Sequence, residues 1–235
     1  MSDRKTELAE NAAEVKQALA EAALKAGRKP EDVTLVAVSK IKPASDVRAL
    51  CEAGQMDFGE NYLQEAVAKQ EELADLDVNW HFIGGLQSNK AKFVAGNFGL
   101  VHSVDSRKLA QALHKKALSL DVVQDILIQV NIAGEVQKSG IAVENLSELA
   151  DEVMEMEGVR LVGLMTMPPF FDEPERARPV FARLRELKEG LEKQLGTPLP
   201  HLSMGMTGDF IPAVEEGATL VRIGTRIFGT RPPRV

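Results

Sequence analysis

The chain has 235 residues, of which 44% are hydrophobic and 27% charged, and its net charge is −7. This composition argues against a disordered or fibrous protein, and the length suits one α/β barrel, which needs about 200 to 250 residues. The acidic charge balance argues against broad binding to nucleic acid or to an anionic membrane. Cys51 is the only cysteine, so an internal disulfide and a thiolate metal cluster are both excluded.

The first 27 residues predict a helix, because their apolar residues fall near one face and Gly27 suits a helix end. They show no signal-peptide pattern. No apolar run in the chain approaches the roughly 18 residues that a membrane span needs. We therefore expect a cytoplasmic protein that does not bind membranes.

Beyond Pro30, short runs rich in β-branched residues alternate with longer amphipathic runs. The eight predicted strands are Val33–Lys40, Met56–Glu60, Asn79–Ile83, Leu100–Val104, Asp125–Ile132, Arg160–Met167, His201–Met204 and Thr219–Ile223. The clearest helices between them are Ala44–Gly54, Leu63–Ala74, Ser106–Ser119, Glu144–Glu157 and Pro174–Leu195. Several strands are nearly continuous apolar runs, which is typical of parallel strands covered on both faces.

Strands that alternate with helices indicate βαβ units and a parallel sheet. Eight such units favour closure into a (β/α)8 TIM barrel over an open doubly wound sheet, which remains the alternative. The Gly-rich fingerprint of the open sheet is missing after the first strand, where Val38-Ser-Lys40 stands instead. We predict one domain over residues 1–235, a barrel with an extra N-terminal helix.

The carboxyl ends of the strands form the active sites of α/β barrels, so the residues there are the candidates for chemistry. Lys40 ends the first strand, where it is either a solvated lysine or an amine pointing into the barrel mouth. In the second case the loss of hydration favours the neutral amine, which condenses with aldehydes. Asn61 follows the second strand, and it either caps the next helix or bonds to a ligand oxygen.

The last two strands indicate an anion site. Ser203 precedes a Gly-rich turn, and Gly224 and Thr225 end the final strand. Backbone N–H groups at such turns bind anions, and phosphate sites recur after strands seven and eight of α/β barrels, although turn formation alone would explain the glycines. The segment 222–235 carries four arginines and no acid, so it is either a solvated tail or a positive rim beside this site.

Arg222 shares the inward direction of Gly224, because residues two apart on a strand point to the same side. A buried arginine needs a partner, which is either a carboxylate on a neighbouring strand or a heterocyclic nitrogen of a ligand. No metal site is expected, because the histidines lack metal-site spacing with any acid or cysteine. These histidines are His81, His102, His114 and His201.

Seven stretches, in this order, resemble the pyridoxal phosphate homeostasis proteins, small relatives of the alanine racemase barrel. They are Ala37–Lys40 with Lys42-Pro43, Phe58–Asn61, Trp80–Gly84 with Leu86–Lys90, Lys138–Gly140, Gly163–Met165, Ser203–Met206, and Val221–Thr225 with Ile227–Gly229. They span nearly the whole chain from Val33 onward.

The resemblance implies six residues that bind pyridoxal 5′-phosphate (PLP): Lys40, Asn61, Ser203, Arg222, Gly224 and Thr225. Lys40 would form the internal aldimine, Arg222 would face the pyridine nitrogen, and Asn61 would lie near the ring. The remaining three would hold the phosphate.

Two departures from the family pattern stand out. Gly85 occupies a place where the family often has proline, and Thr207-Gly208 replaces a more usual Ser-Asp pair beside the phosphate loop. Lys42 and Lys138 do match, and the resemblance implies that they make secondary cofactor contacts or take part in transfer.

The same residues favour a carrier over an enzyme. PLP is an effective electron sink when its pyridine nitrogen is protonated, and Arg222 does not readily give up a proton to it. The racemase relatives also use a tyrosine from an additional β domain, whereas Tyr62 is the only tyrosine here and is expected to pack or cap a helix.

We predict a non-catalytic monomer that stores or buffers PLP, or delivers it to PLP-dependent apo-enzymes. The alternatives are a small amino-acid racemase or α-carbon lyase, and a barrel with a phosphate site that binds no pyridoxal.

Overall fold

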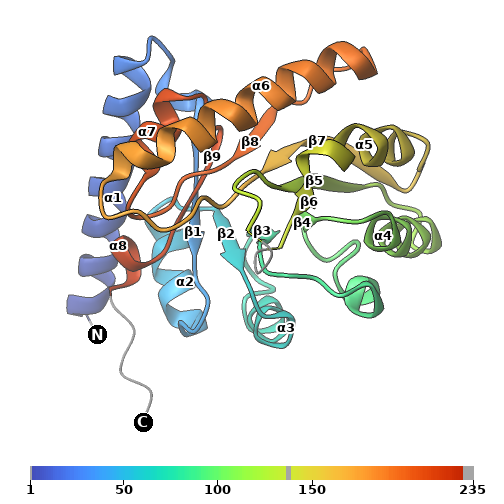
Figure 1. Ribbon diagram of the computed structural model, residues 1–235. Coiled ribbons are helices and arrows are strands. Elements are labelled where there is room, and N and C mark those ends of the chain that lie inside the picture. Colours follow the sequence, from blue (N-terminus) through green and yellow to red (C-terminus); the bar gives the residue numbers. More distant parts are fainter. Residues whose placement is uncertain (1, 136–138, 230–235) are drawn as a thin grey trace.

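The computed structural model describes residues 2–135 and 139–229, and its main feature is a closed parallel barrel (Figure 1). The barrel strands are β1 (Thr34–Val38), β2 (Asp57–Glu60), β3 (Asn79–Phe82), β4 (Leu100–Val104), β5 (Gln124–Asn131), β7 (Val159–Met165), β8 (His201–Ser203) and β9 (Leu220–Ile223). Neighbours pair in the order β4, β3, β2, β1, β9, β8, β7, β5, and β4 also pairs with β5, which closes the barrel. The predicted (β/α)8 barrel is confirmed, and the open doubly wound sheet is wrong.

Helices surround this barrel. The α-helices are α1 (Ser2–Lys25), α2 (Ala44–Glu52), α3 (Leu63–Glu72), α4 (Arg107–Ser119), α5 (Leu146–Met154), α6 (Arg178–Leu195), α7 (Phe210–Glu215) and α8 (Thr225–Phe228). The 3-10 helices are η1 (Pro30–Asp32), η2 (Ser88–Phe93), η3 (Val143–Asn145) and η4 (Pro174–Ala177). The helix-like stretch that the sequence indicates after Gly208 is α7, whereas α8 and the short strand β6 (Ile141–Ala142), which pairs with β5 outside the barrel order, were not predicted.

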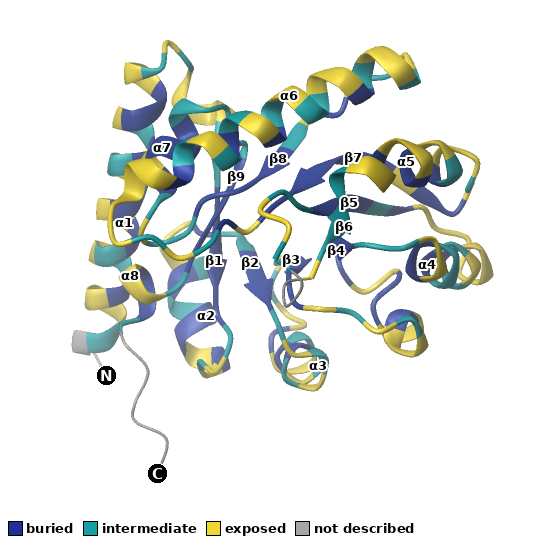
Figure 2. Ribbon diagram, in the orientation of Figure 1, coloured by how far each residue is buried: buried dark blue, intermediate teal, exposed yellow. Residues whose placement is uncertain are grey.

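The apolar residues form two separate cores, one inside the barrel and one between the strands and the helices. The inner core consists of Val36, Leu100, Leu127, Val162, Met165 and Leu220. The outer core contains the buried faces of the helices, whose exposed faces are yellow in Figure 2, while the barrel strands are mostly dark blue. Because Arg222 and His102 each lie two residues after an inner-core leucine, they also point into the barrel.

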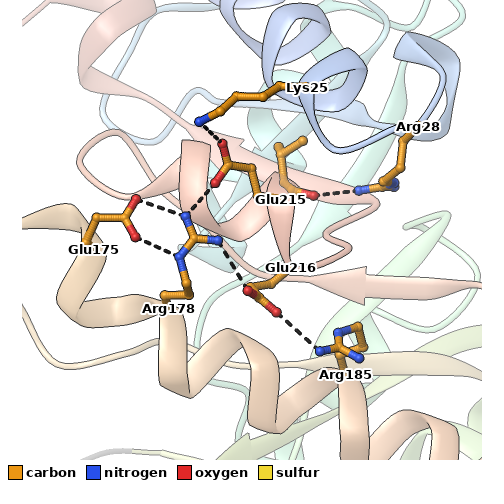
Figure 3. A network of polar contacts seen from close by, with 8 residues as sticks. Lys25, Arg28, Glu175, Arg178, Arg185, Glu215 and Glu216 are labelled. Atoms are coloured by element: carbon orange, nitrogen blue, oxygen red, sulfur yellow. Dashed lines mark hydrogen bonds and ion pairs between the residues drawn. The ribbon is translucent and has the colours of Figure 1, made fainter.

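The extra N-terminal helix α1 lies outside the barrel beside α2, α7 and α8 (Figure 1). An ion-pair network joins α1, α6 and α7 on this side of the molecule (Figure 3). In it, Arg178 of α6 pairs with Glu175, Glu215 and Glu216, and Lys25 of α1 pairs with Glu215. Within the described residues, every helix is too short or too polar to span a membrane.

Candidate functional site

A cavity of about 580 Å³ opens at the carboxyl ends of the strands, where the sequence predicts the site. Its wall is formed by residues at or just after the carboxyl ends of six strands, β1, β2, β3, β7, β8 and β9. Five of the six predicted ligand residues line it, namely Lys40, Asn61, Arg222, Gly224 and Thr225. Ser203 is fully buried and does not line this cavity.

Lys40 lies on a tight turn that follows β1. Ser39 extends the pairing with β2 through its N–H, which donates to the Gly59 carbonyl at 3.1 Å, and the N–H of Lys42 donates back to the Ser39 carbonyl at 3.0 Å. Between them, Ile41 has a φ of 62°, a left-handed conformation that is strained for a β-branched residue. Lys40 is thus half-buried on the cavity wall, at a point where the backbone is strongly constrained.

A buried charged cluster lies under this turn and was not predicted. The ammonium of Lys69, on α3, donates to the Ser39 carbonyl at 2.6 Å and to the carboxylates of Glu60 at 2.8 Å and Glu65 at 2.6 Å. Burial raises the pKa of Glu60, while its bonds from Lys69 and from the Ser39 hydroxyl oppose that shift. The cluster therefore ties the turn that carries Lys40 to α3.

Asn61 does not cap α3, because Tyr62 occupies the N-cap position. Its side-chain oxygen is buried and has no hydrogen-bond partner among the described residues. Its backbone packs so tightly against Gly84 that a Cβ on Gly84 would lie 2.1 Å from the Asn61 carbonyl oxygen. Asn61 is therefore held firmly and presents an acceptor that a ligand donor can satisfy.

Arg222 is 4% exposed and points into the barrel, as predicted. Its guanidinium donates to the Ser203 hydroxyl and, at 3.0 Å, to the carbonyl of Thr166. Burial lowers the pKa of Arg222 to about 10, a shift that the charge of Asp209 opposes. Arg222 forms no ion pair within residues 2–135 and 139–229, so the alternative of a structural carboxylate partner finds no support there.

Ser203 links Arg222 to two histidines, His102 and His81, whose place in the site was not predicted. His102 Nδ1 lies 2.8 Å from the Ser203 hydroxyl, and His102 Nε2 lies 2.9 Å from His81 Nδ1. His81 Nε2 in turn lies 3.1 Å from the carboxylate of Asp57. No metal-binding cluster of His, Cys, Asp and Glu occurs in the part of the chain that the structure describes.

The predicted phosphate end of the cavity combines two turns. Gly224 and Thr225 begin the short helix α8, and Met206–Asp209 follow β8. The N–H of Met206 donates to Asp209 at 2.6 Å, and burial raises the pKa of that carboxyl against this bond. Both residues of the unusual Thr207-Gly208 pair line the same cavity as Gly224 and Thr225.

An apolar segment, Met167–Phe171, also lines this cavity and was not predicted. Phe170 in this segment is 90% exposed. Two prolines follow Met167, and they restrict the backbone of this segment. The cavity wall therefore combines the polar side chains of Lys40, Asn61 and Arg222 with this apolar segment.

Comparison with known proteins identifies the family. The model of the alanine racemase N-terminal domain matches residues 7–232. A pyridoxal phosphate homeostasis protein of Pseudomonas aeruginosa is 50% identical over 224 residues, covering 95% of this chain and 96% of that protein. The one of Aquifex aeolicus is 45% identical over 222 residues, covering 94% and 97%. The chain belongs to the pyridoxal phosphate homeostasis protein family.

A solved structure of another protein supports this placement. PipY of Synechococcus elongatus, solved with PLP bound, is 37% identical to this chain, with a TM-score of 0.84. The alignment covers 94% of this chain and all of PipY. The resemblance that the sequence motifs indicated is thus confirmed at the level of both sequence and fold.

Two other residues that the sequence singled out, Lys42 and Tyr62, do not line the cavity. The ammonium of Lys42 donates to the carbonyls of Phe228 at 3.1 Å and Gly229 at 3.4 Å, which ties it to the end of α8. Tyr62 is 49% exposed and makes no side-chain cap bond on α3, so its expected capping role is not observed. Lys138 and the arginines of the basic tail beyond Gly229 lie outside the described residues.

Proposed function

We propose that the protein is a cytoplasmic carrier that binds PLP, buffers the free cofactor and delivers it to PLP-dependent apo-enzymes. The observation that carries the proposal is Arg222, a buried cation on the wall of a cavity that Lys40 also lines. Its hydrogen-bond partners among the described residues, the Ser203 hydroxyl and the Thr166 carbonyl, are both neutral. Burying such a charge is costly, so it favours a ligand that brings an acceptor or a negative charge. The name of the family and the PLP bound by PipY support PLP as that ligand.

The residues on the cavity wall fit the groups of this cofactor. When bound, PLP supplies an aldehyde that condenses reversibly with amines. Lys40 offers the amine, and Arg222 offers donors to the pyridine nitrogen. The side-chain oxygen of Asn61 offers an acceptor near the ring, and Gly224 with the hydroxyl of Thr225 offers donors to the phosphate. A cavity of about 580 Å³ lies within the usual range for small-molecule sites.

The protonation properties of the side chains that line the cavity support a carrier role. An arginine facing the pyridine nitrogen keeps it unprotonated, because Arg222 remains charged even with its lowered pKa near 10. Among the described residues that line the cavity, the titratable side chains are Lys40, Asp209 and Arg222. Tyr62, the only tyrosine in the sequence, is exposed and does not line the cavity.

The first experiment compares visible spectra of the wild type, Lys40→Ala and Lys42→Ala after mixing with PLP. We expect the wild type and Lys42→Ala to show the band of a lysine-bound cofactor, and borohydride to fix it to the protein. Lys40→Ala should lose the band. A band that survives in Lys40→Ala assigns the cofactor to another lysine, and no band in any sample overturns the proposal.

A small racemase is the second candidate, and the observation that favours it is Asp209. This carboxyl lines the cavity, and burial raises its pKa, which is a common property of acid–base groups. Incubation of the PLP-loaded protein with alanine in deuterium oxide separates the two functions. A carrier leaves the Cα proton in place and transfers PLP to an apo-aminotransferase, whereas a racemase exchanges the proton for deuterium.

A further inference from the structure

A continuous hydrogen-bonded relay crosses the interior of the barrel from the cavity to its opposite end. It runs from Arg222 through Ser203, His102 and His81 to Asp57. Asp57 begins β2, and its side chain is 26% exposed at the amino-terminal end of the barrel. Both imidazoles and the serine are buried, so each of their polar atoms must find its partner within the relay.

Only one direction of donation satisfies every member of the relay. Arginine has donors and no acceptor, so Arg222 must donate to the Ser203 oxygen. The Ser203 hydroxyl then donates to His102 Nδ1, which leaves the His102 proton on Nε2 to donate to His81 Nδ1. The His81 proton on Nε2 donates to Asp57, a carboxylate that can only accept. The relay therefore joins a buried cation to a carboxylate through two neutral imidazoles.

The charges around His102 favour this neutral form. Burial lowers the pKa of His102 well below its ordinary value, and His81, Arg222 and His201 lower it further. His201 is itself half-buried, and burial and His81 lower its pKa while Asp125 opposes the shift. Lys16 on α1 faces Asp57 from outside the barrel, where the attraction of the carboxylate partly offsets the effect of burial on that lysine.

We propose that His102 is a positioning residue for Arg222. By accepting the Ser203 proton, it fixes the serine oxygen as an acceptor for the guanidinium and so orients the remaining Arg222 donors toward the cavity. The inference rests on the proposed function only where it concerns PLP, because the relay itself is a property of the unloaded protein.

The first test uses the protein without cofactor. Long-range ¹H–¹⁵N NMR spectra distinguish the two neutral tautomers of histidine. We expect both His102 and His81 to carry their proton on Nε2 at neutral pH. A His102 that is protonated, or that carries its proton on Nδ1, overturns the relay whether or not the protein binds PLP.

The second test measures the affinity for PLP and for the analogue in which carbon replaces the ring nitrogen. His102→Phe removes the relay beside Ser203 and is expected to weaken PLP binding about tenfold, the effect of one hydrogen bond to a charged group. Binding of the analogue should change less than about twofold, because it offers Arg222 no acceptor. Ser203→Ala supplies the same comparison if His102→Phe does not fold.

The matched control is His114→Phe, because His114 on α4 also accepts one hydrogen bond, from the N–H of Gly158 at 2.9 Å, but lies outside the barrel. We expect it to leave both affinities unchanged. Equal losses for PLP and the analogue in His102→Phe, or no loss for either, overturn the positioning role. If the wild type binds neither ligand, the proposed function fails while the NMR result on the relay still stands.

Discussion

The backbone N–H of Ile41 donates to the carboxylate of Glu65, and Ile41 is the strained residue directly after Lys40. The same carboxylate accepts a bond from Lys69, which also holds the carbonyl of Ser39. Helix α3 is thus hydrogen-bonded to the turn on both sides of Lys40, at Ser39 and at Ile41. Backbone strain of this kind persists only where surrounding contacts enforce it, and it concentrates at functional sites.

Relief of the backbone strain at Ile41 should change the stability of the protein and its affinity for PLP in opposite directions. Ile41→Gly is expected to raise the free energy of unfolding by up to about 1 kcal/mol, because glycine adopts the left-handed region without a Cβ penalty. It should also weaken PLP binding, because the turn then has other conformations open to it. Asp121→Gly is the matched control, since Asp121 has a φ of 56° and does not line the cavity. Denaturant unfolding and PLP titration check both variants, and unchanged binding by Ile41→Gly contradicts a positioning role for the turn.

The buried cluster around Lys69 predicts a large loss of stability when its cation is removed. Lys69→Met leaves the fully buried Glu60 uncompensated, so we expect a cost of about 3 kcal/mol in the free energy of unfolding. Adding Glu60→Gln to this variant should recover part of the loss, because no unpaired charge then remains at that position. Lys188→Met removes a half-exposed pair with Glu192 and should cost at most about 1 kcal/mol. If Lys69→Met and Lys188→Met lower the free energy of unfolding by similar amounts, the buried cluster stabilises the protein no more than a surface ion pair does.

Much of the fold could be predicted because its physical causes are local. Continuous apolar runs such as Val33–Lys40 and Asp125–Ile132 indicate parallel strands with both faces covered. In the structure β1 lies within the first run, and β5 overlaps the second with a shift of one residue at each end. The inward direction of Arg222 follows from strand parity alone. The connection between β3 and β4 was missed, because η2 is a short 3-10 helix without the apolar periodicity of an α-helix.

The interior of the candidate site could not be predicted in the same way. Asp57, His81, His102 and Ser203 come from four strands, and only the closed barrel brings them together. The sequence indicates that Lys69 is a solvated lysine on a helix. In the structure it is only 5% exposed, because α3 packs it against Glu60 at the end of β2. These pairings depend on register and closure, which no short sequence pattern contains.

Two ligands can show how Ser203 acts. If it works through Arg222, Ser203→Ala should lower the affinities for PLP and for pyridoxal, which lacks the phosphate, by the same factor. We expect this result, because the Ser203 hydroxyl is bonded to Arg222 and His102 and does not line the cavity. Thr225→Ala, in contrast, should weaken only the binding of PLP. A loss confined to PLP in Ser203→Ala would restore this serine as a phosphate ligand.

The network around Arg178 should make stability depend on acid pH. Glu215 forms ion pairs with Lys25 and Arg178, and these pairs, the one with Lys25 most strongly, hold the pKa of Glu215 below the ordinary 4.5. Because the folded-state pKa is the lower one, this contribution is complete above about pH 4.5 and is lost as the pH falls through the folded value. Arg178→Ala should therefore cost about 1 kcal/mol at neutral pH and progressively less in acid. Arg183→Ala, which removes an exposed pair with Glu186 on the same helix, should show little effect at any pH.

Adjacent glycines provide the sharpest steric test of the site. A Cβ on Gly84 would lie 2.1 Å from the carbonyl oxygen and 2.7 Å from the Cα of Asn61, whereas a Cβ on Gly85 would meet no atom within 4 Å. Gly84→Ala must displace the Asn61 backbone, so we expect a loss of about 2 kcal/mol in stability and weaker PLP binding. Gly85→Ala should change the free energy of unfolding by less than about 0.5 kcal/mol and leave binding intact. Thermal melts and PLP titrations of the two variants test this expectation. If Gly84→Ala and Gly85→Ala have the same stability and the same affinity for PLP, then packing against Gly84 is not what holds Asn61 at the cavity.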